Sequence, residues 1–162
     1  MDNNKSSLPN ERRKSFLEAM KPSDLRIGNI IEFNGLYLPI GELSNKGFDE
    51  WWVVGLNDDQ ILTASFSHKG IRPVPLNKAW AEKFNMTIDK EWSMQKNKSV
   101  DLFGIGIGSS AHLYYSKIDG FYIDGKFMDE PIYLHSDGHV HQLQNLYFAL
   151  TGEDLILDTD SI

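Results

Sequence analysis

The sequence predicts an α+β fold: a small SH3-like β-barrel or sheet, a short helix, a second antiparallel sheet and a C-terminal amphipathic helix. Short apolar runs separated by turn residues fill the stretches 25–76 and 99–135, as expected of strands. Apolar residues recur at helical spacing over 139–151. A length of 162 residues, of which 41% are hydrophobic, fits one domain with a substantial core.

The first 20 residues differ from the rest of the chain, because they are mostly polar and carry charges of both signs. We expect a flexible N-terminal extension over 1–20, since polar termini make few of the buried contacts that order a chain. A single folded domain is expected over 21–158. Met20 directly precedes it and is a candidate start of translation in place of Met1.

The β-rich region over 25–76 contains a clear hairpin signal. Asn34-Gly35 separates two apolar runs, and both positions of such a turn favour a positive φ. Four or five short strands at this spacing predict a small curled sheet or an SH3-like barrel. Pro73 and Pro75 end the region, because proline has no N–H to donate to a sheet.

A short helix is expected over 77–85. Asn77 is a typical N-cap, whose side chain accepts a hydrogen bond from a free backbone N–H. Trp80 and Phe84 recur one helical turn apart, and Asn85 suits the left-handed conformation that ends many helices. The residues that follow, 89–98, are polar and predict a mobile loop.

The second half returns to strands over 99–135, with Asp-Gly turn dipeptides at 119–120 and 124–125. A helix is then predicted over 139–151, with Gly152 as its stop. Its apolar side chains fall within an arc of about 120° at 3.6 residues per turn. They are Val140, Leu143, Leu146, Tyr147 and Leu150.

This last helix carries a resemblance. The segment 140–155, VHQLQNLYFALTGEDL, resembles the closing segment of a family of short proteins from Bacteroidota genomes and their phages. Members tend to open on a stretch similar to 25–29 and to carry a Pro-x-Pro-Leu segment, as at 73–76, before a Trp- or Leu-bearing helix. The resemblance implies a phage or prophage context but no activity and no functional residues. This chain departs from the family in its N-terminal extension and over 136–139.

Composition excludes several classes of site. The chain has no cysteine, which rules out disulfides, cysteine-ligated metals and thiol nucleophiles. Its formal net charge of −7 disfavours nucleic acid, because nucleic-acid binding usually needs clustered Lys and Arg. No apolar run approaches the roughly 20 residues of a membrane span, and we expect no secretory signal, because the first residues lack its apolar core. We therefore expect no membrane association and a cytoplasmic location, that of the host if the protein is phage-encoded.

The sharpest chemical pattern is a series of metal-ligating residue types spaced two apart: His135, Asp137, His139 and His141. On a strand these side chains would share one face, and three imidazoles with a carboxylate suit zinc, iron or manganese. Gly138 marks a turn, however, and His141 belongs to the predicted helix. The alternative is a strand-to-helix turn in which Asp137 caps the helix and the histidines face solvent.

Two surfaces are candidates for binding a partner. Trp51 and Trp52 are adjacent on a predicted strand and so point to opposite faces, which leaves one available to a partner. On the last helix His141, Gln144 and Phe148 form a stripe beside the apolar arc. The stripe predicts a second covered helix face, under either the chain's own sheet or a partner.

The favoured interpretation is a non-enzymatic accessory or interaction protein of phage or mobile-element origin, which binds a protein partner or itself. The alternative is a metal-dependent hydrolase or small-ligand-binding protein that uses the histidine cluster, with a divalent metal as its cofactor. A nucleic-acid-binding SH3-like module is the third hypothesis. The glycine-rich run over 103–108 lacks the following helix that a dinucleotide site requires.

Overall fold

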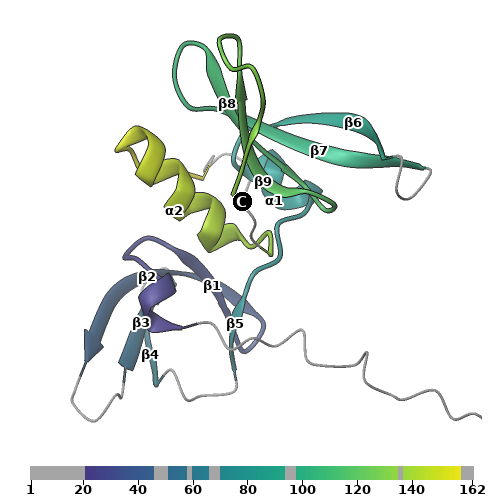
Figure 1. Cartoon of the computed structure of the whole chain (residues 1–162). Coiled ribbons are helices and arrows are strands. Elements are labelled where there is room, and N and C mark those ends of the chain that lie inside the picture. The colour runs from purple at the N-terminus through teal and green to yellow at the C-terminus, as the bar shows by residue number, and fades with distance from the viewer. Residues whose placement is uncertain are drawn as a thin grey trace, which may run out of the picture.

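The computed structural model describes residues 21–45, 51–57, 60–65, 70–93, 98–134 and 137–157. Within them the chain forms two antiparallel β-sheets and two α-helices, an α+β arrangement (Figure 1). The predicted extension over 1–20 lies outside the described residues. Neither helix in the described part of the chain has the length and apolar character needed to cross a membrane.

The N-terminal sheet has five strands in the order β4-β3-β2-β1-β5. A short 3-10 turn, η2 (Pro22–Asp24), precedes β1 (Ile30–Phe33), β2 (Leu36–Asn45), β3 (Trp51–Asn57), β4 (Gln60–Ser65) and β5 (Ile71–Pro73). Asn34 and Gly35 both have positive φ, 50° and 87°, which confirms the predicted hairpin turn between β1 and β2. The register of β2 against β3 shifts between Ile40 and Glu42, as it does at a β-bulge.

Helix α1 (Lys78–Lys83) follows β5 and confirms the short helix expected there. The Asn77 side chain accepts a hydrogen bond from the Trp80 N–H at 3.2 Å, as an N-cap should. Asn85 adopts a φ of 52° just after the helix, as predicted from the sequence. Trp80 is buried and meets the Tyr37 ring edge-on at 5.2 Å, so α1 also contacts the N-terminal sheet.

The second sheet is a five-stranded meander in the order β10-β9-β8-β7-β6. Its strands are β6 (Thr87–Ser93), β7 (Lys98–Gly106), β8 (Ala111–Ser116), β9 (Gly120–Gly125) and β10 (Ile132–Tyr133). The prediction of a polar loop over 89–98 was wrong for residues 89–93, which belong to β6 and pair with β7. Residues 94–97 lie outside the described residues. In β6 the alternate residues Asp89 and Glu91 carry charge on the open face of the sheet, whereas Ile88 packs against the core.

Helix α2 (Val140–Thr151) lies between the two sheets (Figure 1). It ends at Gly152, which has the left-handed φ of 77° that the sequence predicted for the stop. Val140 and Leu143 are fully buried against the inner face of the second sheet. That core contains Phe103, Leu113, Tyr115 and Phe121 from the sheet and Leu76, Trp80, Ala81 and Phe84 from α1 and its approach.

Candidate functional site

Of the residues predicted to bind a metal, Asp137, His139 and His141 are described; they lie at the start of α2 and do not form a metal-binding group. His135 is outside the described residues. Gly138 has a φ of 74°, so the chain turns there and the two-residue strand spacing is lost. No group of three or more His, Asp or Glu side chains in the described part of the chain is placed to hold a metal ion. Asp137 is exposed and does not cap the helix, because His139 is the N-cap.

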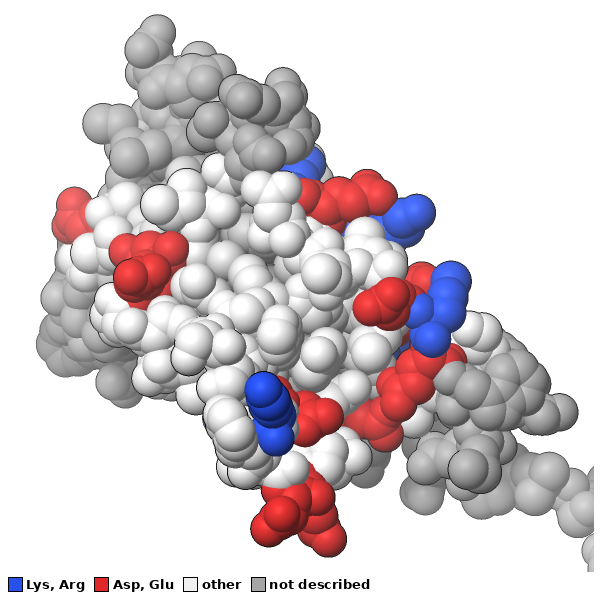
Figure 2. Space-filling model, turned by 90° about the horizontal axis from the view of Figure 1, so that it is seen from above, with Lys and Arg blue, Asp and Glu red and all other residues white. Residues whose placement is uncertain are grey.

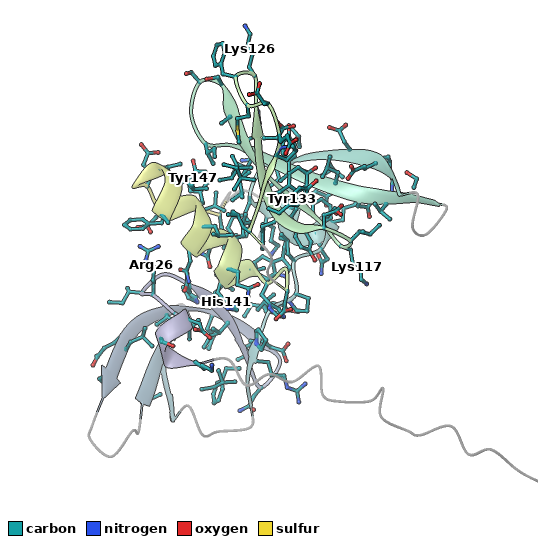
Figure 3. The ribbon with its side chains drawn as sticks, in the orientation of Figure 1. Arg26, Lys117, Lys126, Tyr133, His141 and Tyr147 are labelled. Atoms are coloured by element: carbon teal, nitrogen blue, oxygen red, sulfur yellow. The ribbon has the colours of Figure 1, made fainter. Side chains whose placement is uncertain are left out.

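His141 is buried rather than solvent-facing. Its side chain is only 3% exposed and stacks on His139 with ring centroids 5.6 Å apart. Burial, together with the neighbouring His139, lowers the pKa of His141 to about 4, although Asp24 acts in the opposite direction. The ring is therefore neutral at pH 7, and its Nδ1 has no hydrogen-bond partner. His141 belongs to the junction between α2 and the N-terminal part of the chain (Figure 3).

Gln144 fastens α2 to that N-terminal part. Its Oε1 accepts a hydrogen bond from the Ile30 N–H at 2.9 Å, and its Nε2 donates to the Gly28 carbonyl at 3.1 Å. Beside it, Asn145 Nδ2 donates to the Asp24 carbonyl at 2.7 Å. Side-chain amides thus pair with backbone groups of the segment that leads into β1, some 114–121 residues earlier in the chain.

Phe148 extends the same junction towards solvent. The Arg26 guanidinium lies 3.6 Å from the centre of the Phe148 ring and also pairs with Asp154 at 3.2 Å. Phe148 keeps 37% of its surface exposed. The second covered face of the last helix is therefore real, and this chain's own N-terminal part covers it. His141 and Gln144 are buried in this arrangement, which corresponds to the first of the two alternatives for the stripe, cover by the chain itself.

Trp51 and Trp52 lie in β3, where Trp52 is paired with Ser44 on one side and Ser65 on the other. Only their backbone is described, so their predicted role in partner binding remains a prediction.

The outer face of the second sheet carries a row of aromatic side chains that the sequence did not single out. One residue from each strand is in register across the sheet: Thr87, Gly104, Tyr114, Tyr122 and Tyr133. The Tyr114 and Tyr122 rings stack with centroids 5.3 Å apart, and the Tyr122 and Tyr133 rings lie 5.6 Å apart. We call these three side chains the tyrosine row. The intervening residues point into the core, because strand side chains alternate between faces.

Gly104 makes room for the tyrosine row. A Cβ atom at this position would lie 2.7 Å from Cε1 of Tyr114 and 2.9 Å from Oγ1 of Thr87. The Tyr114 ring therefore leans over the bare backbone of β7. Tyr122, in the middle of the row, is only 9% exposed, whereas Tyr133 at the sheet edge is 50% exposed.

The charges around the tyrosine row are acidic. Asp89 and Glu91 of β6 and Asp124 of β9 alternate onto the same face. Burial raises the pKa of Tyr122, and the Glu91 carboxylate raises it further. Glu91 Oε2 is buried without a hydrogen-bond partner. On the side of the molecule seen in Figure 2, acidic side chains likewise surround a largely uncharged expanse and exceed the basic ones.

Comparison with known proteins gives no functional assignment. No protein-family model matches this sequence, and neither the curated proteins nor the solved structures contain a significant match. The function has to be inferred from the geometry of this chain.

Proposed function

We propose that this chain is a non-enzymatic accessory protein that binds a protein partner through the tyrosine row on the outer face of the second sheet. The observation that carries the proposal is the in-register aromatic row on a sheet face bordered by carboxylates. Tyrosine is enriched among the residues that dominate protein–protein binding energy, because its rigid ring buries a large area while its hydroxyl stays hydrogen-bonded.

The chemistry of this face favours a basic partner segment. Tyrosine rings attract Arg and Lys side chains by cation–π interaction, and carboxylates complement the same charge. The Asp89 and Asp124 carboxylates on the same face would attract an incoming guanidinium by charge. Lys90, the one described lysine side chain within these strands, pairs with Asp101 towards the inner face. A net charge of −7 steers a basic segment towards the protein and disfavours nucleic acid.

The proposal also includes the origin of the protein, its location and the SH3-like character of its N-terminal sheet. The resemblance of segment 140–155 supports a phage or mobile-element origin, and a cytoplasmic location would accompany it. The strand order β4-β3-β2-β1-β5 and the bulge in β2 support an SH3-like curl of the N-terminal sheet. Genes for virion or replication proteins beside this one would strengthen the assignment of origin.

An NMR titration tests the proposed surface. An Arg-rich peptide should shift the backbone amides of β8–β10, whereas a Glu-rich peptide of equal length should not. Tyr133→Ala should weaken binding of the Arg-rich peptide by about fivefold or more. Tyr37→Ala is the matched control, because Tyr37 is similarly exposed, at 55%, but lies on the other sheet. Equal losses in both variants, or shifts confined to other elements, would refute this surface.

A further inference from the structure

The inner side of the second sheet contains a cavity, separate from the tyrosine row. It has a volume of about 510 Å³ and lies between the start of α1, strands β6 and β7, the end of β8 and the loop before α2. This volume is within the range of about 300–1,000 Å³ typical of small-molecule sites. Leu76, Phe103 and Tyr115 form its apolar wall, and all three are largely buried.

Lysines gather at the rim of the cavity. Lys78 comes from α1, Lys90 from β6 and Lys117 from the turn after β8, so three separate elements bring cations to one opening. Two carboxylates, Asp101 and Asp137, also line it. Three lysines against two aspartates leave a net charge of +1 at the rim, on a chain whose net charge is −7.

The pairing of these charges leaves Lys117 and Asp137 without an ion pair within the described residues. Lys90 forms an ion pair with Asp101, and Lys78 lies 3.7 Å from Glu82 one helical turn away. Lys117 is exposed and makes no ion pair within the described residues. In Figure 3 it lies at the right of the view, below the second sheet, and extends outward.

The Tyr115 hydroxyl is a polar group at the wall of the cavity. Gly138, with a φ of 74°, passes so close to the Tyr115 hydroxyl that any side chain at position 138 would overlap it. Burial raises the pKa of Tyr115, and the Asp137 carboxylate raises it further. The phenol is therefore protonated at pH 7 and retains a proton to donate. Its ring stacks on Phe103, with centroids 6.2 Å apart, and so forms a flat wall.

We propose that this cavity binds a small organic anion, with an aromatic or other flat apolar group on the Phe103 and Tyr115 wall and a carboxylate or phosphate among the rim lysines. An apolar wall below rim lysines favours a ligand with both an apolar group and an anionic group over a bare inorganic ion. A charge-assisted hydrogen bond from Lys117 would supply the main anion contact. This site goes beyond the proposed partner surface, because it lies on the opposite face of the sheet and takes a different ligand.

The test uses phenyl phosphate and benzoate as probes and benzyl alcohol as a neutral analogue, titrated into the full chain and followed by amide NMR shifts. Both anions should shift amides that line the cavity, and benzyl alcohol should bind at least about fivefold more weakly. The two anions distinguish a phosphate-preferring from a carboxylate-preferring site. Lys117→Met should weaken binding of the preferred anion by about tenfold.

Lys126→Met is the matched control, because it also removes one exposed cation but from a loop outside the cavity lining. It should leave the affinity for the anions unchanged. Equal losses in the two variants would show a bulk charge effect and overturn the proposal. Equal binding of benzyl alcohol, or no shift of cavity amides at millimolar probe, would overturn it as well. Because the tyrosine row is not involved, Tyr133→Ala should not change anion binding.

Discussion

Acidification should destabilise this protein through His141. Its folded-state pKa is about 4, against about 6.5 in an unfolded chain. The folded state therefore binds fewer protons than the unfolded state between these values. The contribution of the neutral ring is fully present above about pH 6.5 and is lost as the pH falls towards 4. The difference between the two pKa values corresponds to about 3 kcal/mol of unfolding free energy.

Urea unfolding between pH 4 and 7.5, followed by tryptophan fluorescence, measures this loss. Carboxylates also titrate below pH 5, so the wild type must be compared with His141→Gln, which keeps a neutral polar side chain. The difference between the two unfolding free energies should change by about 3 kcal/mol across the window.

His139→Gln is a necessary companion, because burial lowers the pKa of His139 as well and its ring stacks on His141. A difference between wild type and His141→Gln that stays flat with pH would refute the buried, neutral assignment. So would a His141 pKa near 6.5 measured by NMR in the folded protein.

Three further changes test the junction and the turn before α2. Gln144→Leu leaves its two backbone partners unsatisfied and should cost about 2–4 kcal/mol in urea unfolding. In Gly138→Ala the alanine would have to adopt a φ of 74°, and its Cβ would overlap the Tyr115 hydroxyl. Thermal unfolding should therefore show a loss of at least about 2 kcal/mol in unfolding free energy. Phe148→Asp removes the ring under Arg26 and should lower the unfolding free energy measured in urea by about 1 kcal/mol, with the fold intact. Complete unfolding of this variant would instead make Phe148 a core residue.

Local chemistry explains which elements the sequence could predict. The Asn34-Gly35 turn, the Asn77 cap and the Gly152 stop each depend on one or two residues and their immediate neighbours. Strand β6 was missed because its open face is charged and only alternate residues such as Ile88 face the core. In a half-buried edge strand, composition resembles that of a loop.

The sites could be predicted less well, because they depend on register and long-range contacts. The histidine spacing suggested a metal only if the segment were a strand, and the positive φ of Gly138 removes that condition. The tyrosine row joins Tyr114, Tyr122 and Tyr133, whose alignment follows from how β8, β9 and β10 pair. The stripe beside the apolar arc predicted a second covered face on α2, but its spacing carries no information that residues 24–30 cover it.

The hydrogen bonds of Gln144 also have a consequence for synthesis of the chain. The Ile30 N–H meets its partner only after 114 more residues have been added. While the protein emerges from the ribosome, the segment before β1 therefore lacks both its amide partner and the helix that shields it. The N-terminal sheet should mature late, in step with the arrival of α2, and degradation of stalled or truncated chains should begin in this early-made segment.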